Sequence, residues 1–66
     1  MEVNVVSIQE LRINQGLSQR QLAKRAGLSP GAVWRLEQQG SAHPETLKKV
    51  ADVLGVLPTD LLKKGR

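Results

Sequence analysis

Apolar residues recur at helical spacing in the first half of the chain, and a glycine separates two such runs. Leu22 and Ala23 fall on one face of one expected helix, and Val33 and Leu36 fall on one face of the next. Gly27 lies between them, where a residue without a Cβ easily adopts the positive φ of a tight turn. The pattern therefore predicts two helices held together by a turn, with the outer face of the second helix left exposed.

Capping signals and prolines predict where the helices begin. Ser7, followed three residues later by a glutamate, predicts a helix over residues 8–15, and Ser18, followed by a glutamine, predicts a second helix that ends near Ala26. Helix starts are also expected at three prolines: Pro30 for a third helix over 30–38 that Ser29 caps, Pro44 for a fourth helix, and Pro58 for a short fifth helix. Five glycines follow helical stretches and are suited to ending them: Gly16, Gly27, Gly40, Gly55 and Gly65.

The sequence therefore predicts an all-α fold around one core. Residues 2–6 are β-prone and precede the first cap, so they form either a frayed arm or a short strand that needs a partner. We expect an N-terminal arm over residues 1–6 and a single domain over residues 7–66. The residues at core spacing are Ile8, Leu11, Leu17, Leu22, Ala23, Ala26, Leu28, Val33, Leu36, Leu47, Val50, Ala51, Leu54 and Leu61.

Composition narrows the classes of function. Sixty-six residues make one small domain, too short for a sizeable catalytic cleft, and no Ser/His/Asp set stands out, so we expect no enzyme. With no cysteine and a single histidine, His43, we expect no metal site, and we expect no cofactor. Nothing in the chain indicates a membrane span or export, which favours a cytoplasmic protein. The net charge of +4 favours a polyanionic partner, although many soluble domains are equally basic.

Several short phrases, in order, resemble one known family. They read Gly-Leu-Ser-Gln at 16–19, Gln-Leu-Ala at 21–23, Ala-Gly-Leu-Ser at 26–29, Val-Trp-Arg-Leu-Glu at 33–37 and Pro-Glu-Thr-Leu at 44–47. From residue 8 to residue 62 the chain is similar to the phage repressor and Cro type of helix-turn-helix, the Xre-like regulators of bacteria. The resemblance implies a compact, lambda-repressor-like bundle of five helices, which binds operator DNA as a homodimer through its third helix.

The resemblance also implies roles for single residues. An arginine of the first helix commonly pairs with a glutamate of the third helix in this family, and Arg12 and Glu37 stand at matching places. Such a pair would hold the recognition helix at its angle. Gln19 stands where the family often places a glutamine against a phosphate or against the recognition helix. Arg20 and Lys24 share an outer face and form either phosphate contacts or a solvated basic surface.

The third helix is expected to carry the specificity. Arg35 either bonds to O6 and N7 of a guanine or contacts a phosphate. Trp34, the only aromatic residue, packs either on DNA sugar, phosphate or a thymine methyl, or flat on neighbouring helices. The chain departs from better studied members at Pro30, Gly31 and Ala32, where those often carry long polar side chains. Either the Gly31 backbone approaches DNA closely, or the module has lost sequence discrimination.

These observations favour a small transcriptional repressor that inserts its third helix into the major groove of a double-stranded, palindromic operator. The alternative is a protein-interaction module or antitoxin-like co-regulator on the same fold, with Trp34 as its hot spot. A C-terminal apolar group either forms a dimer surface or closes the monomer's own core: Val53, Val56, Leu57 and Leu62. The residues expected to contact DNA are Ser18, Gln19, Arg20, Ser29, Pro30, Gly31, Trp34, Arg35, Gln38 and Ser41.

Overall fold

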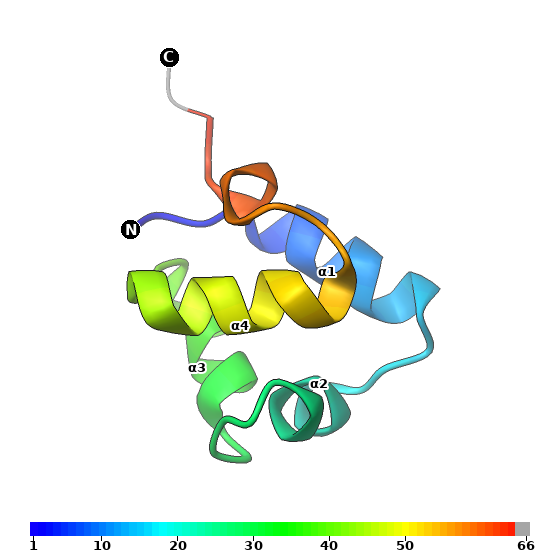
Figure 1. Ribbon diagram of the computed structural model, residues 1–66. Helices are drawn as coiled ribbons and strands as arrows, with labels where there is room; N and C mark the ends of the chain where they lie inside the picture. Colours follow the sequence, from blue (N-terminus) through cyan, green and yellow to red (C-terminus); the bar gives the residue numbers. More distant parts are fainter. Residues whose placement is uncertain (65–66) are drawn as a thin grey trace.

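The computed structural model describes residues 1–64 and consists of helices joined by short turns (Figure 1). The elements are α1 (Val5–Asn14), α2 (Gln19–Arg25), α3 (Ala32–Gln39), α4 (Pro44–Leu54) and the 3-10 helix η1 (Pro58–Leu61). In Figure 1, α4 crosses the middle of the molecule, with α2 and α3 below it and η1 above it. The all-α expectation is confirmed for the described residues. The fifth helix, however, is a single 3-10 turn and not an α-helix.

The core forms where the apolar faces of all these elements meet. Most of the residues at core spacing are buried, and Ile8, Leu22, Leu47 and Leu61 are fully so. Three of the expected core residues are only half-buried, namely Leu11, Ala26 and Leu28. The sequence analysis missed one core residue, Val3, which is 3% exposed. One continuous core therefore ties the N-terminal residues to the rest of the molecule.

The start of the first helix differs from the prediction. α1 begins at Val5 and not at Ile8, because Asn4 is the N-cap and its Oδ1 accepts a hydrogen bond of 3.0 Å from the Ser7 backbone N–H. Ser7, expected to be the cap, lies inside the first turn. The boundary between residues 6 and 7 therefore falls within α1.

Tertiary contacts explain this earlier start. Residues Glu2 and Val3 form isolated β-bridges with Ser41 and Leu62, and the Asn4 backbone N–H donates to the Leu61 carbonyl at 2.8 Å. The chain before Asn4 is thus extended and held in place on both sides. Helix formation after Asn4 overrides the β-propensity of the valines that follow it.

The start of the third helix also differs from the prediction. α3 begins at Ala32, and its N-cap is Gly31, which makes no side-chain cap. The Ala32 N–H donates to the Ser29 carbonyl at 3.0 Å, so Pro30 and Gly31 lie in a turn ahead of the helix. Ser29 therefore does not cap α3; its Oγ accepts a hydrogen bond of 3.4 Å from Arg35 Nη2. The turn leaves α3 two residues shorter at its start than expected.

Other predicted boundaries are confirmed. Gly27 has φ +72° after α2, and Gly16, Gly40 and Gly55 also have positive φ, whereas Gly65 lies outside the described residues. Pro44 begins α4 as expected. Val53, Val56 and Leu62 are partly buried against the core, which leaves Leu57, 66% exposed, as the most open member of the C-terminal apolar group. No helix in residues 1–64 is long and apolar enough to cross a membrane.

Candidate nucleic-acid interface

The two faces of α3 differ sharply in burial. Val33, Leu36 and Glu37 face inward and are buried, with Val33 fully covered. Trp34 is 53% exposed on the outer face, and Arg35 and Gln38 are exposed beside it. Because these residues recur at i, i+1 and i+4, they form one continuous outer surface of the helix. α3 is therefore fixed by one face and free to bind through the other.

A buried carboxylate fixes the inner face. Arg12 Nε donates to Glu37 Oε2 at 3.0 Å, and the side chains are 13% and 1% exposed, so the expected pair is present. Glu37 Oε1 also accepts hydrogen bonds from Gln19 Nε2 at 2.8 Å and from Gln9 Nε2 at 3.3 Å. Arg12 Nη1 donates to the Leu17 carbonyl at 3.1 Å. The charge is thereby compensated, and a single carboxylate joins α1, α2 and α3.

The first turn of α2 is closed by a capping box, as expected. Ser18 Oγ accepts from the Gln21 N–H at 3.1 Å, and Gln21 Oε1 accepts from the Ser18 N–H at 2.9 Å. Gln19, for which the sequence left two roles open, here contacts the recognition helix through Glu37. The orientation of the Gln19 side chain is therefore set by a hydrogen bond within the protein.

Basic residues dominate the exposed charge around α2 and α3, since the acidic residue of α3, Glu37, is buried. Residues 11–36 contain five basic residues and no acidic residue. Four of these five basic residues are exposed: Arg20, Lys24, Arg25 and Arg35. Arg20 and Lys24 also line, with Pro30, a shallow hollow on the outside of α2. This part of the surface favours a polyanion more clearly than the net charge of the chain does.

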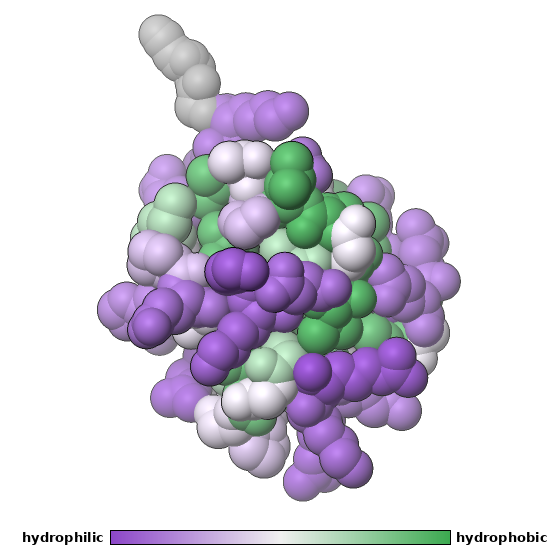
Figure 2. Space-filling model, viewed as in Figure 1, coloured by the Kyte–Doolittle hydropathy of each residue, from purple (hydrophilic) through white to green (hydrophobic). Residues whose placement is uncertain are grey.

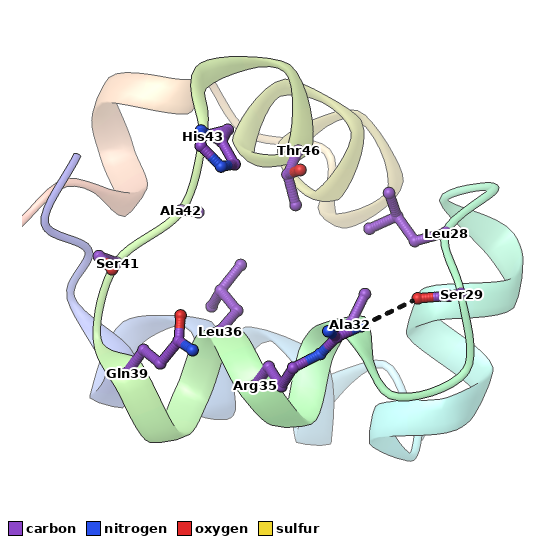
Figure 3. Close-up of a pocket in the computed structure, with 10 residues that line it drawn as sticks. All are labelled: Leu28, Ser29, Ala32, Arg35, Leu36, Gln39, Ser41, Ala42, His43 and Thr46. Carbon is purple, nitrogen blue, oxygen red and sulfur yellow. Dashed lines mark hydrogen bonds between the residues drawn. The ribbon is translucent and has the colours of Figure 1, made fainter.

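A second hollow lies between α3 and the segment that leads into α4 (Figure 3). Figure 3 shows Arg35 on α3 reaching toward Ser29, while Ser41 and His43 line the opposite side. The contact between Arg35 and Ser29 directs the guanidinium toward the turn before α3. Polar groups therefore border the outer surface of α3 on the side of Arg35.

The match to a known family agrees with this geometry. A family model described as helix-turn-helix matches residues 8–62, which is most of the chain and includes all of α2, α3 and α4. The chain belongs to the helix-turn-helix family. This family, of the Xre and lambda-repressor type, comprises DNA-binding transcriptional regulators. A comparison with curated proteins gives no match.

The helix-turn-helix places the expected contact residues at the start of α2, in the turn before α3, along α3 and just beyond it. Only Gln19 and Ser41 are half-buried, and the other eight are exposed: Ser18, Arg20, Ser29, Pro30, Gly31, Trp34, Arg35 and Gln38. The sequence analysis missed Gln9, which joins the Glu37 cluster. Its position three residues before Arg12 on α1 is the signal that points to it, since residues at that spacing share a helix face.

Proposed function

We propose that the protein is a small transcriptional repressor that binds one double-stranded operator sequence and acts by occupying it. The observation that supports this proposal most is the outer face of α3, which is exposed and carries Trp34, Arg35 and Gln38 on a helix fixed from behind. An α-helix of this kind fits the major groove, where each base pair presents a distinct pattern of donors, acceptors and methyl groups.

The residues divide into two roles in this proposal. Arg35 donates hydrogen bonds to O6 and N7 of a guanine. Gln38, three residues further along α3, contacts the major groove beside this base pair. Arg20, Ser18, Ser29 and Ser41 contact phosphates on either side, which sets the register of the helix without reading sequence. Gln19 supports α3 through Glu37.

We further propose that two copies bind a palindromic operator. One short helix with a single residue that reads a base gives little discrimination between DNA sequences. Two copies with centres about 34–36 Å apart double the number of base contacts. Leu57 is the best candidate contact between copies, because it is 66% exposed and follows the half-buried Val53 and Val56. Figure 2 shows hydrophobic residues around the segment that follows α4, beside a hydrophilic band across α4.

A second candidate function is protein binding. Trp34 leaves 53% of its surface exposed, and tryptophan is enriched among the hot spots of protein interfaces. In this case the chain is a co-regulator or an antitoxin-like partner that uses the outer face of α3 for another protein. The charged residues of segment 11–36 are all basic, which favours DNA over this alternative.

Selection of duplexes from a random pool, followed by affinity measurements at several salt concentrations, tests the proposal. We expect one enriched sequence, bound more tightly than a scrambled duplex, with an affinity that falls steeply as salt increases. Lys49→Ala, an exposed basic residue of α4 outside the proposed surface, is the matched control and keeps both properties. Absence of duplex binding at low salt contradicts the proposal and favours the protein-binding function.

A further inference from the structure

The outer face of α3 lacks polar side chains at its N-terminal end. Trp34 lies in the first turn, and the residues three and four positions before it are Gly31 and Pro30, both exposed. An added Cβ on Gly31 meets no atom within 4 Å, so open space surrounds this position. Arg35 and Gln38 supply the nearest hydrogen-bonding side chains on the same face. The surface on the N-terminal side of Trp34 is therefore formed by Pro30 and Gly31 and is open at Gly31, while Arg20 and Lys24 border Pro30 on the side of α2.

Trp34 is the third residue of α3, near the end of the helix through which recognition helices read bases. Side chains on an α-helix lean toward its N-terminus and cover the turn before their own Cα. Trp34 is thus directed over the turn that holds Pro30 and Gly31, and the N-terminal residues of such a helix are the ones that contact base edges. Leaving a tryptophan 53% exposed in water is unfavourable for the free protein, and covering it upon binding recovers that free energy.

Among the groups that distinguish the base pairs in the major groove, the thymine methyl is the apolar one. Guanine, cytosine and adenine present hydrogen-bonding atoms there, whereas thymine adds a 5-methyl group that apolar side chains contact. We infer that Trp34 is a specificity-determining residue that reads the 5-methyl group of a thymine in the major groove, next to the base pair that Arg35 contacts. This inference rests on the proposed function, because it requires α3 to enter the groove of double-stranded DNA.

Replacement of thymine by deoxyuridine tests this inference directly, because it removes the methyl group and keeps every hydrogen-bonding atom of the base pair. The probes are duplexes that the wild-type chain selects from a random pool, remade with one thymine at a time replaced by deoxyuridine. We expect one position in each half-site at which the replacement weakens binding about fourfold, the effect of one buried methyl group. Trp34→Ala weakens binding to the thymine duplex and binds both duplexes equally.

Two further variants separate the methyl contact from other roles of the indole. Trp34→Phe keeps an apolar ring without the N–H donor, so the preference for thymine over deoxyuridine remains. Ile13→Ala removes another exposed apolar side chain, 64% exposed on α1, and leaves both the preference and the melting temperature unchanged. Equal melting of Trp34→Ala and the wild type shows that the effect is not one of folding.

Each contrary outcome has a distinct meaning. Sequence-specific binding that no deoxyuridine replacement weakens overturns the methyl contact and leaves the proposed function standing. Equal sensitivity of wild type and Trp34→Ala to the replacement assigns the methyl to another residue and also overturns the inference. Failure of the wild type to prefer any duplex over a scrambled one overturns the proposed function itself.

Discussion

Gln19 donates a hydrogen bond of 2.8 Å to Glu37, so the first turn of α2 is tied to the buried side of the recognition helix. Glu37 is 1% exposed at its side chain and accepts from three side chains that come from two other helices. The angle of α3 is therefore set by a polar cluster as well as by apolar packing. A buried carboxylate left without one of its donors is destabilised, which makes the cluster sensitive to single substitutions.

Gln19→Ala tests whether this residue supports α3. We expect the variant to lose about 1.5–3 kcal/mol of stability, since one hydrogen bond to a charged and buried acceptor disappears while Arg12 and Gln9 keep theirs. Denaturant unfolding measures this loss. Ser18→Gly serves as a control for helix capping in the same turn, because replacing a cap by glycine costs only a few tenths of a kcal/mol. Unchanged stability of Gln19→Ala, with weaker DNA binding, makes Gln19 a phosphate contact instead.

Arg12→Ala is expected to have the larger effect. Its partner is buried, and removal of one member of a buried ion pair costs about 3–5 kcal/mol because the other charge stays uncompensated. A domain of this size has a total stability of about 3–10 kcal/mol, so the variant sits near the limit of folding. Melting temperature and DNA affinity should fall together, although Arg12 does not contact bases in our proposal.

Arg12→Lys and the double variant Arg12→Met/Glu37→Leu keep this prediction testable. The lysine keeps the charge but lacks the fork that donates to Glu37 and to the Leu17 carbonyl, so an intermediate loss is expected. The double variant removes both charges but also the acceptor of Gln9 and Gln19, so it is expected to recover part of the stability that Arg12→Ala loses. If Arg12→Ala melts like the wild type, the pair has no role in holding α3.

Gly31→Ala tests whether the backbone before α3 approaches DNA closely. The free protein has room for the added methyl group, and φ at Gly31 is −91°, so stability changes by no more than about 1 kcal/mol. If DNA lies against this backbone, the methyl group clashes and weakens binding by about 1–3 kcal/mol. We expect this weakening in a duplex-binding assay. Unchanged affinity shows that the space beside Gly31 stays open in the complex.

Leu57→Lys tests the proposed contact between copies. Leu57 is 66% exposed, so the change leaves the core intact and the melting temperature near that of the wild type. It places a charge in an apolar interface, which disrupts association. Sedimentation of the wild type on a palindromic duplex should show two copies, and the variant only one. A wild type that remains a monomer both free at high concentration and on DNA contradicts the dimer.

The sequence predicted the parts of the fold that depend on local signals. Hydrophobic spacing identified the buried face of α4, and Gly27 identified the turn between α2 and α3, because helical period and positive φ are both encoded by neighbouring residues. Family resemblance identified the partners Arg12 and Glu37, but spacing alone does not show that Gln9 and Gln19 converge on the same carboxylate. That convergence depends on how three helices cross.

The errors lie where hydrogen bonds that the sequence pattern does not reveal determine local structure. Val3 was expected in either a frayed arm or a short strand and not in the core, whereas its backbone N–H donates to the Gly40 carbonyl and its side chain is buried. Ser29 and Pro30 form a plausible helix start in sequence, but the turn closed by the Ala32 N–H begins α3 two residues later. In both cases a hydrogen bond that the local sequence does not specify outweighs the local preference.

A comparison of Arg35→Ala with Arg20→Ala separates base reading from charge. Both residues are exposed and carry the same charge, so each variant is the matched control for the other. Arg35→Ala should cost about 1–3 kcal/mol on the selected duplex and much less on a scrambled one, because a guanine edge carries sequence information. Arg20→Ala should weaken both duplexes alike and reduce the slope of log affinity against log salt by about one.

Measurement of both variants on both duplexes at two salt concentrations distinguishes the two roles. Equal weakening of both duplexes by Arg35→Ala makes this residue a phosphate contact, and specificity then depends on Trp34, Gln38 or the shape of the DNA. Ser29→Ala adds a third comparison, since it removes the 3.4 Å contact that directs the Arg35 guanidinium in the free protein. If that contact preorganises Arg35, Ser29→Ala weakens binding to the selected duplex more than to the scrambled one, whereas loss of a phosphate contact at Ser29 alone weakens both duplexes alike.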